Sequence, residues 1–419
     1  MSCTSTRIFR HEALTMLKIF EVIRRSGPIA QVEISRRLNI TRTAVNTYVQ
    51  KLVKEGVVYS ASQCRVGVGR PQTLLDIHRD ENGAIGFSVD YPYVHVGISN
   101  FAEEIIASQC TDVSAVTTRE DLEQYIVAAA RAMKAAAARE KVTLHSTCFA
   151  TAGALDGVTG KVTKAVNFPA TQDLDAQGLL SPLLRTPVYV VPSTVATYWG
   201  GLTDEDEDCR VFHVIWDIGV GTILGTGTDI RLSNFQRDPD GIGRGLRDMG
   251  HVIYKPGGRK CHCDEHGCLE AYFGGWAMIR DLQEAEGGKN SLSFLDFLAR
   301  AKANDAHVRD LIVSRGRELG SVLGWIFTAH KPCRIKLSGR VADVGSWVFD
   351  AFCDGIRQRL GTQDLDKIFA PAWVTPTNEL QLSGACRLAT HVRFNLPLLP
   401  IVRMAEDVDE LTDAVVQMP

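Results

Sequence analysis

The sequence predicts a mixed α/β protein in which a small, mainly helical N-terminal domain precedes a larger body of two α/β units. Three observations support this. Apolar residues recur at helical spacing through residues 12–54, strands alternate with helices from residue 79 onward, and charge is divided unevenly. Residues 1–78 carry 12 Lys and Arg against 5 Asp and Glu, a net charge of +7, which leaves −10 for the remainder of a chain whose total is −3. A basic head on an acidic body suits phosphate binding confined to the head.

The amino-acid composition is that of a globular protein. The 419 residues are 45% hydrophobic and 23% charged, which is enough for two or three ordinary globular cores. No stretch of about 18 apolar residues occurs and the first residues lack an apolar signal segment, so we expect a cytoplasmic protein without a membrane span. Of the 11 cysteines, three crowd into residues 261–268 and the others are scattered, which favours a metal site over a disulfide framework.

The N-terminal pattern predicts a winged helix-turn-helix over residues 1–78. The segment Ser26-Gly27-Pro28 stops the first apolar period, Asn39-Ile40 forms a turn, and Thr41 caps the third helix. The predicted elements are helices at residues 12–25, 29–38 and 41–54 and strands at residues 57–59 and 73–77. The two strands flank a glycine-rich loop, RVGVGRP, which has the composition of a wing.

The third helix separates polar from apolar side chains, as a recognition helix requires. Its apolar residues, which can face the core, are Ala44, Val45, Tyr48, Val49 and Leu52. Arg, Asn and Gln on the other face can pair with guanine or adenine edges in the major groove, and arginines of the wing can approach a backbone or the minor groove. The predicted DNA-binding residues are Arg42, Thr43, Asn46, Thr47, Gln50, Arg65 and Arg70. The alternative interpretation is a winged helix that binds another protein.

The body divides into a first α/β lobe at residues 79–200 and a second at residues 201–419 with C-terminal helices. In the first lobe we expect strands at residues 84–89, 94–99, 146–150 and 188–191 and an Ala-rich helix at residues 120–141. In the second we expect strands at residues 211–217 and 334–337 and helices at residues 269–284, 292–302 and 307–330. The acidic run at residues 204–208, near the start of the second lobe, is interpreted as a solvated loop.

A cysteine and histidine cluster predicts a metal site. The segment CHCDEHGCLE places Cys261, Cys263 and Cys268 within eight residues, and His251 lies ten residues before Cys261. Four such ligands suit a closed, tetrahedral, structural zinc (Zn²⁺) site, with no open position for a catalytic water. His262 and His266 compete as ligands, and free thiols are the alternative.

These motifs resemble the ROK family (repressors, open reading frames, kinases) over nearly the whole chain. The resemblance rests on the GRP wing, the GH…CxC…GCLE cluster, the segment LSGRVADVG and the segment GACRLA, and GCLEAYFGG is its most specific part. It implies an actin-like (ribonuclease H-like) two-lobed body and a zinc held by His251, Cys261, Cys263 and Cys268. One turn glycine of the family's Cys-Gly-x-x-Gly-Cys pattern is Asp264 here, whereas Gly267 remains.

Family members without a DNA-binding head are commonly sugar kinases, and three departures predict that this chain is not an enzyme. The resemblance places a phosphate-binding Asp-x-Gly-Gly-Thr hairpin at Asp90-Tyr91-Pro92-Tyr93, where the proline has no N–H to donate. It places the general-base aspartate at Pro192-Ser193, and serine is a poor proton acceptor near neutral pH. The glutamate of the family's Glu-x-Gly-His motif is Asp248 here.

The resemblance also implies a small polar cleft that binds an effector. The predicted effector-binding residues are Gly153, Asn167, Asp248, His251 and Glu270. Glu270 would accept a hydrogen bond from a sugar hydroxyl, and His251 would touch the ligand while its ring nitrogen holds zinc. Other interpretations remain open. Glu270 interacts with the dipole at the start of a helix, Asn167 lies in a turn and Asp248 is solvated. In that case the whole site no longer binds a ligand and has only a structural role. The stretch DIGVGTILGTG, which begins at Asp217, resembles a second phosphate hairpin, but such glycine turns also occur without a nucleotide.

Together these features predict a transcriptional regulator of carbohydrate genes, a repressor by the habit of the family. We expect it to bind double-stranded, palindromic operator DNA as a homodimer or homotetramer and to respond to a small carbohydrate or phosphosugar. The alternatives are an active ROK carbohydrate kinase and a protein-binding scaffold.

Overall fold

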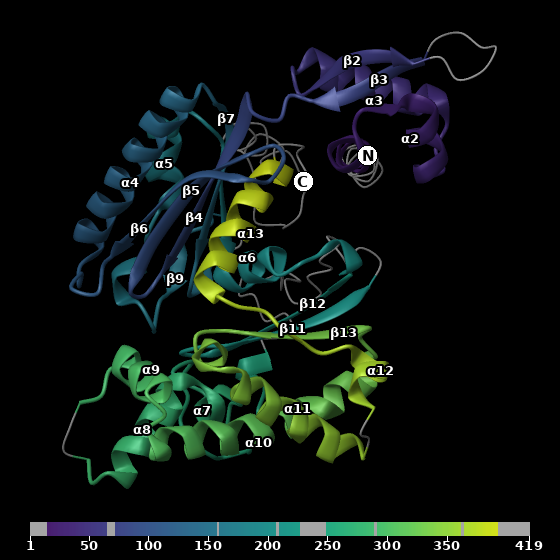
Figure 1. Ribbon diagram of the computed structural model, residues 1–419. Coiled ribbons are helices and arrows are strands. Elements are labelled where there is room, and N and C mark those ends of the chain that lie inside the picture. Colours follow the sequence, from purple (N-terminus) through teal and green to yellow (C-terminus); the bar gives the residue numbers. More distant parts are fainter. Residues whose placement is uncertain are drawn as a thin grey trace, which may run out of the picture.

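The structure is a computed structural model that describes residues 15–64, 72–156, 159–206, 209–226, 249–288, 291–361 and 364–392. Figure 1 shows a head beside a body of two sheets, with helices α6 and α13 lying between the sheets. The predicted mixed α/β architecture is confirmed. Among the described helices, none is long and apolar enough to cross a membrane.

The head is a winged helix-turn-helix, as the sequence predicts. Its elements are a helix at residues 15–26, β1 (Ile29–Ala30), α2 (Gln31–Leu38), α3 (Arg42–Lys54), β2 (Val58–Cys64) and β3 (Gln72–Ile77). The turn between α2 and α3 forms because Asn39 adopts a left-handed conformation (φ 52°) that ends α2, and the Thr41 hydroxyl accepts from the Ala44 N–H to begin α3. Apolar side chains of the three helices and of the sheet, which has the order β1-β3-β2, enclose one small core.

The first lobe is built on a five-stranded mixed sheet with the order β10-β7-β4-β5-β6. Its strands are β4 (Asn82–Asp90), β5 (Tyr93–Asn100), β6 (Ile105–Asp112), β7 (Thr143–Thr151) and β10 (Val188–Pro192), and a small ribbon pairs β8 (Ala154–Leu155) with β9 (Val162–Lys164). Helices α4 (Arg119–Glu140) and α5 (Ala176–Leu184) cover one face of the sheet (Figure 1). Strands β4, β7 and β10 run parallel, so their carboxyl ends share one edge.

The second lobe has a four-stranded sheet with the order β12-β11-β13-β14, covered on its outer face by helices (Figure 1). Its strands are β11 (Arg210–Trp216), β12 (Val220–Thr226), β13 (Arg334–Ser338) and β14 (Ala372–Trp373). Its helices are α7 (Glu270–Phe273), α8 (Gly275–Ala285), α9 (Phe294–Lys302), α10 (Ala306–His330), α11 (Ser346–Leu360) and α12 (Leu365–Phe369). The single helix predicted at residues 269–284 is divided at Gly274, because the Gly275 and Trp276 N–H groups donate to the carbonyls of Asp217 and Ile218 instead of continuing α7.

The C-terminal helix α13 (Thr377–Val392) belongs by contact to the first lobe, although the boundary predicted at residue 200 places it in the second. It packs against β4, β5, β7 and α6 (Ser193–Gly200). Two glycines allow α6 and α13 to touch backbone to backbone: a Cβ at Gly384 would overlap the Ala196 carbonyl, and one at Gly200 would overlap the Leu380 carbonyl. The chain therefore leaves the second lobe and returns to the first to complete its core.

One residue of the acidic run departs from the solvated loop that the sequence predicts, although Asp204 and Glu205 are exposed as expected. Asp206 is fully buried, and its carboxylate accepts from the buried ammonium of Lys336, which also donates to the Gly201 carbonyl at 2.5 Å. A buried ammonium needs a counter-charge, and Asp206 supplies it from the short helical turn Asp204–Asp206. Periodicity and charge count do not show that the partner lies 130 residues away on β13.

Candidate DNA interface, metal centre and interlobe cleft

Helix α3 presents its polar side chains to solvent. All five predicted contact residues on this helix, Arg42, Thr43, Asn46, Thr47 and Gln50, are exposed. Val45, Val49 and Leu52 are buried in the head core, whereas Ala44 and Tyr48 are only partly buried. The Thr47 hydroxyl donates to the Thr43 carbonyl at 3.0 Å, which sets its rotamer. An exposed, hydrogen-bonding helix face of this length fits a major groove. The wing arginines Arg65 and Arg70 lie outside the described residues.

The four residues predicted as metal ligands come together. The ligand atoms of His251, Cys261, Cys263 and Cys268 all lie within 4.8 Å of one another. The Cys261 Sγ is 3.7 Å from the His251 Nδ1, and the Cys263 Sγ is 3.5 Å from the Cys268 Sγ. A tetrahedral zinc with Zn–S bonds of about 2.3 Å has edges of about 3.8 Å, so these separations fit the metal. His262 is turned away, because its ring stacks on Trp276 with 3.8 Å between centroids.

Backbone hydrogen bonds fold the cysteine segment into a compact knuckle. The Cys261 N–H donates to the Glu265 carbonyl at 2.8 Å, and the Tyr254 N–H donates to the Gly267 carbonyl at 2.7 Å. Gly267 has φ 86° and a Cβ there would overlap the Lys255 carbonyl, which explains why this turn glycine is required. The replaced turn glycine, Asp264, also has a positive φ of 76°, and its carboxylate pairs with Lys164 at 2.6 Å.

Glu270 lies near the candidate metal ligand Cys261 at the start of α7, and both of its carboxylate oxygens have partners within the chain. One accepts from the Val220 N–H at 3.2 Å, and the other accepts from the Trp276 indole N–H at 3.1 Å. The carboxylate thereby ties α7 to the turn between β11 and β12. Since each oxygen can accept a second hydrogen bond, these contacts leave Glu270 able to receive a sugar hydroxyl.

Two of the other predicted effector residues come from the first lobe. Gly153 follows β7 with φ 109°, and Asn167 is partly buried in the segment after β9. The ion pair between Lys164 of β9 and Asp264 brings this segment beside the cysteine knuckle, although an exposed pair of this kind stabilises little. Asp248, the remaining predicted residue, lies outside the described residues.

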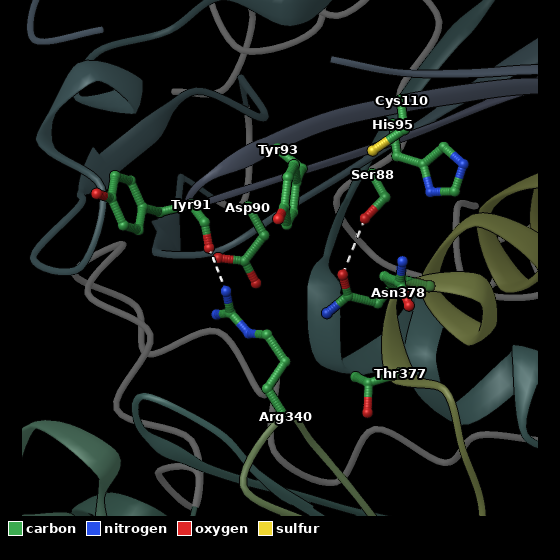
Figure 2. Close-up of a pocket in the computed structure, with 10 residues that line it drawn as sticks. Ser88, Asp90, Tyr91, Tyr93, His95, Cys110, Arg340, Thr377 and Asn378 are labelled. Carbon is green, nitrogen blue, oxygen red and sulfur yellow. Dashed lines mark hydrogen bonds between the residues drawn. The ribbon is translucent and has the colours of Figure 1, made fainter. Parts of the chain in front are cut away.

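Arg340 crosses between the lobes, and sequence reasoning missed it. From the loop after β13 its guanidinium donates to both carboxylate oxygens of Asp217, with its Nε 3.0 Å from each, and to the backbone carbonyl of Tyr91 in the first lobe. It also lies over the Phe294 ring, 5.0 Å from the centroid. Figure 2 shows the side chain extending to the turn of the β4–β5 hairpin, beside Asp90. The Arg340 guanidinium is therefore held between the turn of the β4–β5 hairpin and the turn of the β11–β12 hairpin.

One guanidinium affects two carboxyl groups differently. Burial opposes ionisation of Asp217, but the charge and hydrogen bonds of Arg340 outweigh it and hold the pKa of Asp217 below its ordinary value. Burial, together with the charge of Asp217, raises the pKa of Asp90 to about 6 despite the attraction of Arg340. One Asp90 oxygen, Oδ1, is buried without a hydrogen-bond partner. Asp90 is thus the weaker acid of the two.

The sequence does contain a signal for Arg340. It stands two residues after the end of β13 in LSGRVADVG, and Asp217 directly follows β11 of the same sheet. Strands β11 and β13 are parallel, so residues that follow them meet at one edge. The pairing of β11 with β13, across more than 100 residues, was the missing information.

The fold and the two sites define a class: a winged helix-turn-helix joined to a two-lobed body with a Cys/His knuckle. The chain belongs to the ROK family, whose pattern matches residues 93–391. A winged helix-turn-helix DNA-binding pattern matches residues 14–59. The predicted family and fold class are both confirmed.

Similar proteins of known name include sugar repressors. The chain is 20% identical over 351 residues to the xylose repressor of Bacillus subtilis (strain 168), covering 82% of this chain and 87% of that protein. It is 20% identical over 362 residues to the DNA-binding transcriptional repressor Mlc of Escherichia coli (strain K12), covering 81% and 84% of the two chains.

Solved structures share the fold. A ROK family transcriptional regulator described as a homolog of Escherichia coli Mlc superimposes with a TM-score of 0.72 at 16% identity, covering 94% of this chain and 99% of that one. A ROK family glucokinase from Streptomyces griseus, solved with glucose and AMPPNP, gives 0.59 at 20% identity and covers 73% and 99%. The body therefore has the fold shared by ROK regulators and ROK kinases.

The raised pKa of Asp90 predicts a specific pH dependence of stability. Because its folded pKa of about 6 exceeds the ordinary 3.8, the proton it holds stabilises the folded state fully below about pH 4, and this contribution is lost as pH rises through 6. The Asp90→Asn side chain stays neutral at every pH. The free energy of unfolding of this variant, measured by chemical denaturation and compared with that of the wild type, should therefore be larger at about pH 8 than at about pH 5 by about 1 kcal/mol.

Asp112→Asn is the matched control, because Asp112 is an exposed carboxylate on the same sheet whose pKa is lowered by its hydrogen bonds to Ser114. It should not show this gain. An Asp90→Asn advantage that is independent of pH would contradict the assignment.

Proposed function

We propose that this ROK protein is a sugar-responsive transcriptional regulator that binds double-stranded operator DNA through α3 and does not act as a kinase. The observation that carries the proposal is the exposed face of α3, on which Arg42, Asn46 and Gln50 stand clear of the head core. Side chains of these types can pair with base edges in a major groove. The repressor names of its relatives support the same function.

Two-fold recognition follows from the same helix. One α3 reads only a few base pairs, so a homodimer with two heads on a palindromic site is the arrangement we propose. A small carbohydrate in the cleft between the lobes, near Glu270, Asn167 and Gly153, would favour one interlobe angle and so change the spacing of the heads. Repression is the proposed sign of regulation, because the relatives carry that name.

The cleft argues against phosphoryl transfer. Arg340 already binds Asp217 and the Tyr91 carbonyl, so its guanidinium lies between the two hairpins that would face a nucleotide's phosphates. Ser193 begins α6 directly after β10, at the position where the family resemblance places a general base, and a hydroxyl cannot accept a sugar proton near neutral pH. The alternative function, an active carbohydrate kinase, is favoured only by the shared fold.

We also propose that the knuckle binds structural zinc through His251, Cys261, Cys263 and Cys268. Bound there, zinc would supply a cross-link between the turn at Met249–His251 and the start of α7. That cross-link would hold Glu270 in place. No ligand position would remain for substrate or water, so the role of the metal would be positional.

Removing two base-reading side chains should abolish specific DNA binding. With duplexes selected from a random-sequence pool by the full chain, Arg42→Ala combined with Asn46→Ala should weaken binding at least about 30-fold, since each contact is worth about 1–3 kcal/mol. Fluorescence anisotropy at fixed salt measures the change. Arg139→Ala with Gln109→Ala, an equivalent exposed pair on the body, should bind normally. Equal loss in both variants would refute recognition by α3.

The metal proposal is tested by counting zinc. Native mass spectrometry of the full chain should show about one zinc per chain, and Cys268→Ser should lose it because one of four ligands is gone. Cys333→Ser, which removes an exposed cysteine outside the knuckle, should retain it. A folded Cys268→Ser chain with undiminished zinc would rule out this ligand set.

The absence of kinase activity is tested by turnover. With ATP, magnesium and a panel of aldoses that includes glucose and xylose, ADP release should not exceed that of the chain without sugar. Sustained, sugar-dependent ADP formation that disappears in Asp217→Asn would instead establish the kinase, since a contaminating enzyme would not respond to that substitution.

A further inference from the structure

The head meets the body at a cluster of charged side chains, one buried and the others largely shielded from solvent, which we call the head–body cluster. It consists of Glu21 and Arg24 from the helix at residues 15–26, Glu103 from the turn between β5 and β6, and Arg387 and His391 from α13. Arg24 lies 2.7 Å from Glu21 and 3.4 Å from Glu103, and Arg387 lies 3.0 Å from Glu103. The His391 Nε2 lies 3.2 Å from Glu103 and 3.4 Å from Glu21. Three parts of the chain are thus joined at one point.

The cluster is an ionic joint and not a second metal site. Glu21, Glu103 and His391 place their ligand atoms within 4.8 Å of one another, which is close enough for a cation. However, the guanidinium groups of Arg24 and Arg387 already supply two positive charges to the two carboxylates. Burial would raise the pKa of Glu103, but the hydrogen bond from His391 and the charges of Arg387 and Arg24 outweigh it and hold this pKa at about 2. The carboxylate is therefore ionised and satisfied without metal.

Apolar contacts reinforce the joint. Phe101, two residues before Glu103, is fully buried in the head core although it belongs to the first lobe, and its ring packs edge-on against Phe20 at 5.9 Å. The His391 ring packs edge-on against Trp199 at 4.7 Å, and Arg387 donates to the Trp199 carbonyl at 2.6 Å. The head thus packs against α13 and the β5–β6 turn, in addition to being joined to the body through the chain between β3 and β4.

The opposite end of α13 lies at a pocket between the lobes, whose lining includes Asp90, Arg340 and Thr377. The Thr377 hydroxyl accepts from the Gly339 N–H at 2.7 Å, directly before Arg340, and the Thr377 N–H donates to Asp343 at 2.9 Å. Gln381, one turn further along, accepts from Ser88 of β4 at 2.9 Å. Figure 2 shows Thr377 and Asn378 at the end of this helix, near Arg340. A helix of 16 residues spans about 24 Å, so one element connects the cleft to the head–body cluster.

We propose that α13 couples the interlobe cleft to the DNA-binding head: its first turn follows the second lobe through Gly339 and Asp343, and its last turn sets the head through Glu103 and His391. This inference rests on the proposed function, because it supplies the route by which an effector in the cleft would reach DNA. The close packing of α6 on α13 through Gly200 and Gly384 makes the pair stiff, so displacement at one end moves the other instead of being absorbed.

Amide hydrogen exchange of the full chain, followed by mass spectrometry, tests the coupling without DNA or sugar. Glu103→Gln removes the shared charge and should speed exchange in head peptides of residues 15–58 about ten-fold or more, because breaking a buried ion pair leaves its partners uncompensated. Glu123→Gln, which breaks a partly exposed pair with Arg119 on α4, should leave these peptides unchanged.

The decisive measurement is a double-mutant cycle between the two ends of α13. Arg340→Ala should speed exchange at the start of α13 and also in the head, and in the Glu103→Gln background it should no longer affect the head. If Arg340→Ala destabilises the whole chain, Arg340→Lys keeps the charge while losing the paired hydrogen bonds to Asp217, and it should show the same pattern more weakly.

Additive effects of the two substitutions on head exchange, or a head that does not respond when the start of α13 does, would overturn the coupling. Failure of the proposed function has a different signature. A chain that binds no selected duplex yet shows the non-additive exchange would retain the coupling and lose only the regulator.

Discussion

The structure depends on the packing of α13 between the two sheets. Its small residues Gly384, Ala385 and Ala389 allow a backbone-to-backbone approach to α6 and close contact with β4 and β7. Without this helix, the first lobe would expose the inner face of its sheet and the head would lose its seat on Arg387 and His391. A segment near the end of the described chain therefore organises the lobe, the cleft and the head together.

Paired arginine and acid side chains carry much of the architecture. The pair Arg340–Asp217 joins the loops that follow β13 and β11. Glu103 binds Arg24 of the head and Arg387 of α13, and Lys336 of β13 binds Asp206 in the turn before β11. Each pair is largely desolvated, so removing one partner leaves a costly unpaired charge.

The local sequence pattern was sufficient to predict the features that depend on residues close together in the sequence. The split between Val45, Val49 and Leu52 on one side of α3 and Arg42, Asn46 and Gln50 on the other follows from the helical period alone. The knuckle was likewise predictable, because three of its ligands are within eight residues and must lie close. Long-range pairing was not predictable: the interpretation of Asp206 as solvated failed because Lys336 lies on a strand that only the sheet order brings near.

Sequence by itself therefore determined the ROK family, the winged head, the exposed face of α3 and the four Cys and His residues that cluster as candidate ligands. Tertiary structure alone decided that Arg340 reaches Asp217 and Tyr91, that α13 returns to the first lobe, and that Glu103 meets Glu21 and His391. The physical reason is the separation of the interacting residues along the sequence. Periodicity and short motifs depend on residues a few positions apart, whereas desolvated charge pairs form between any two segments that the fold brings together.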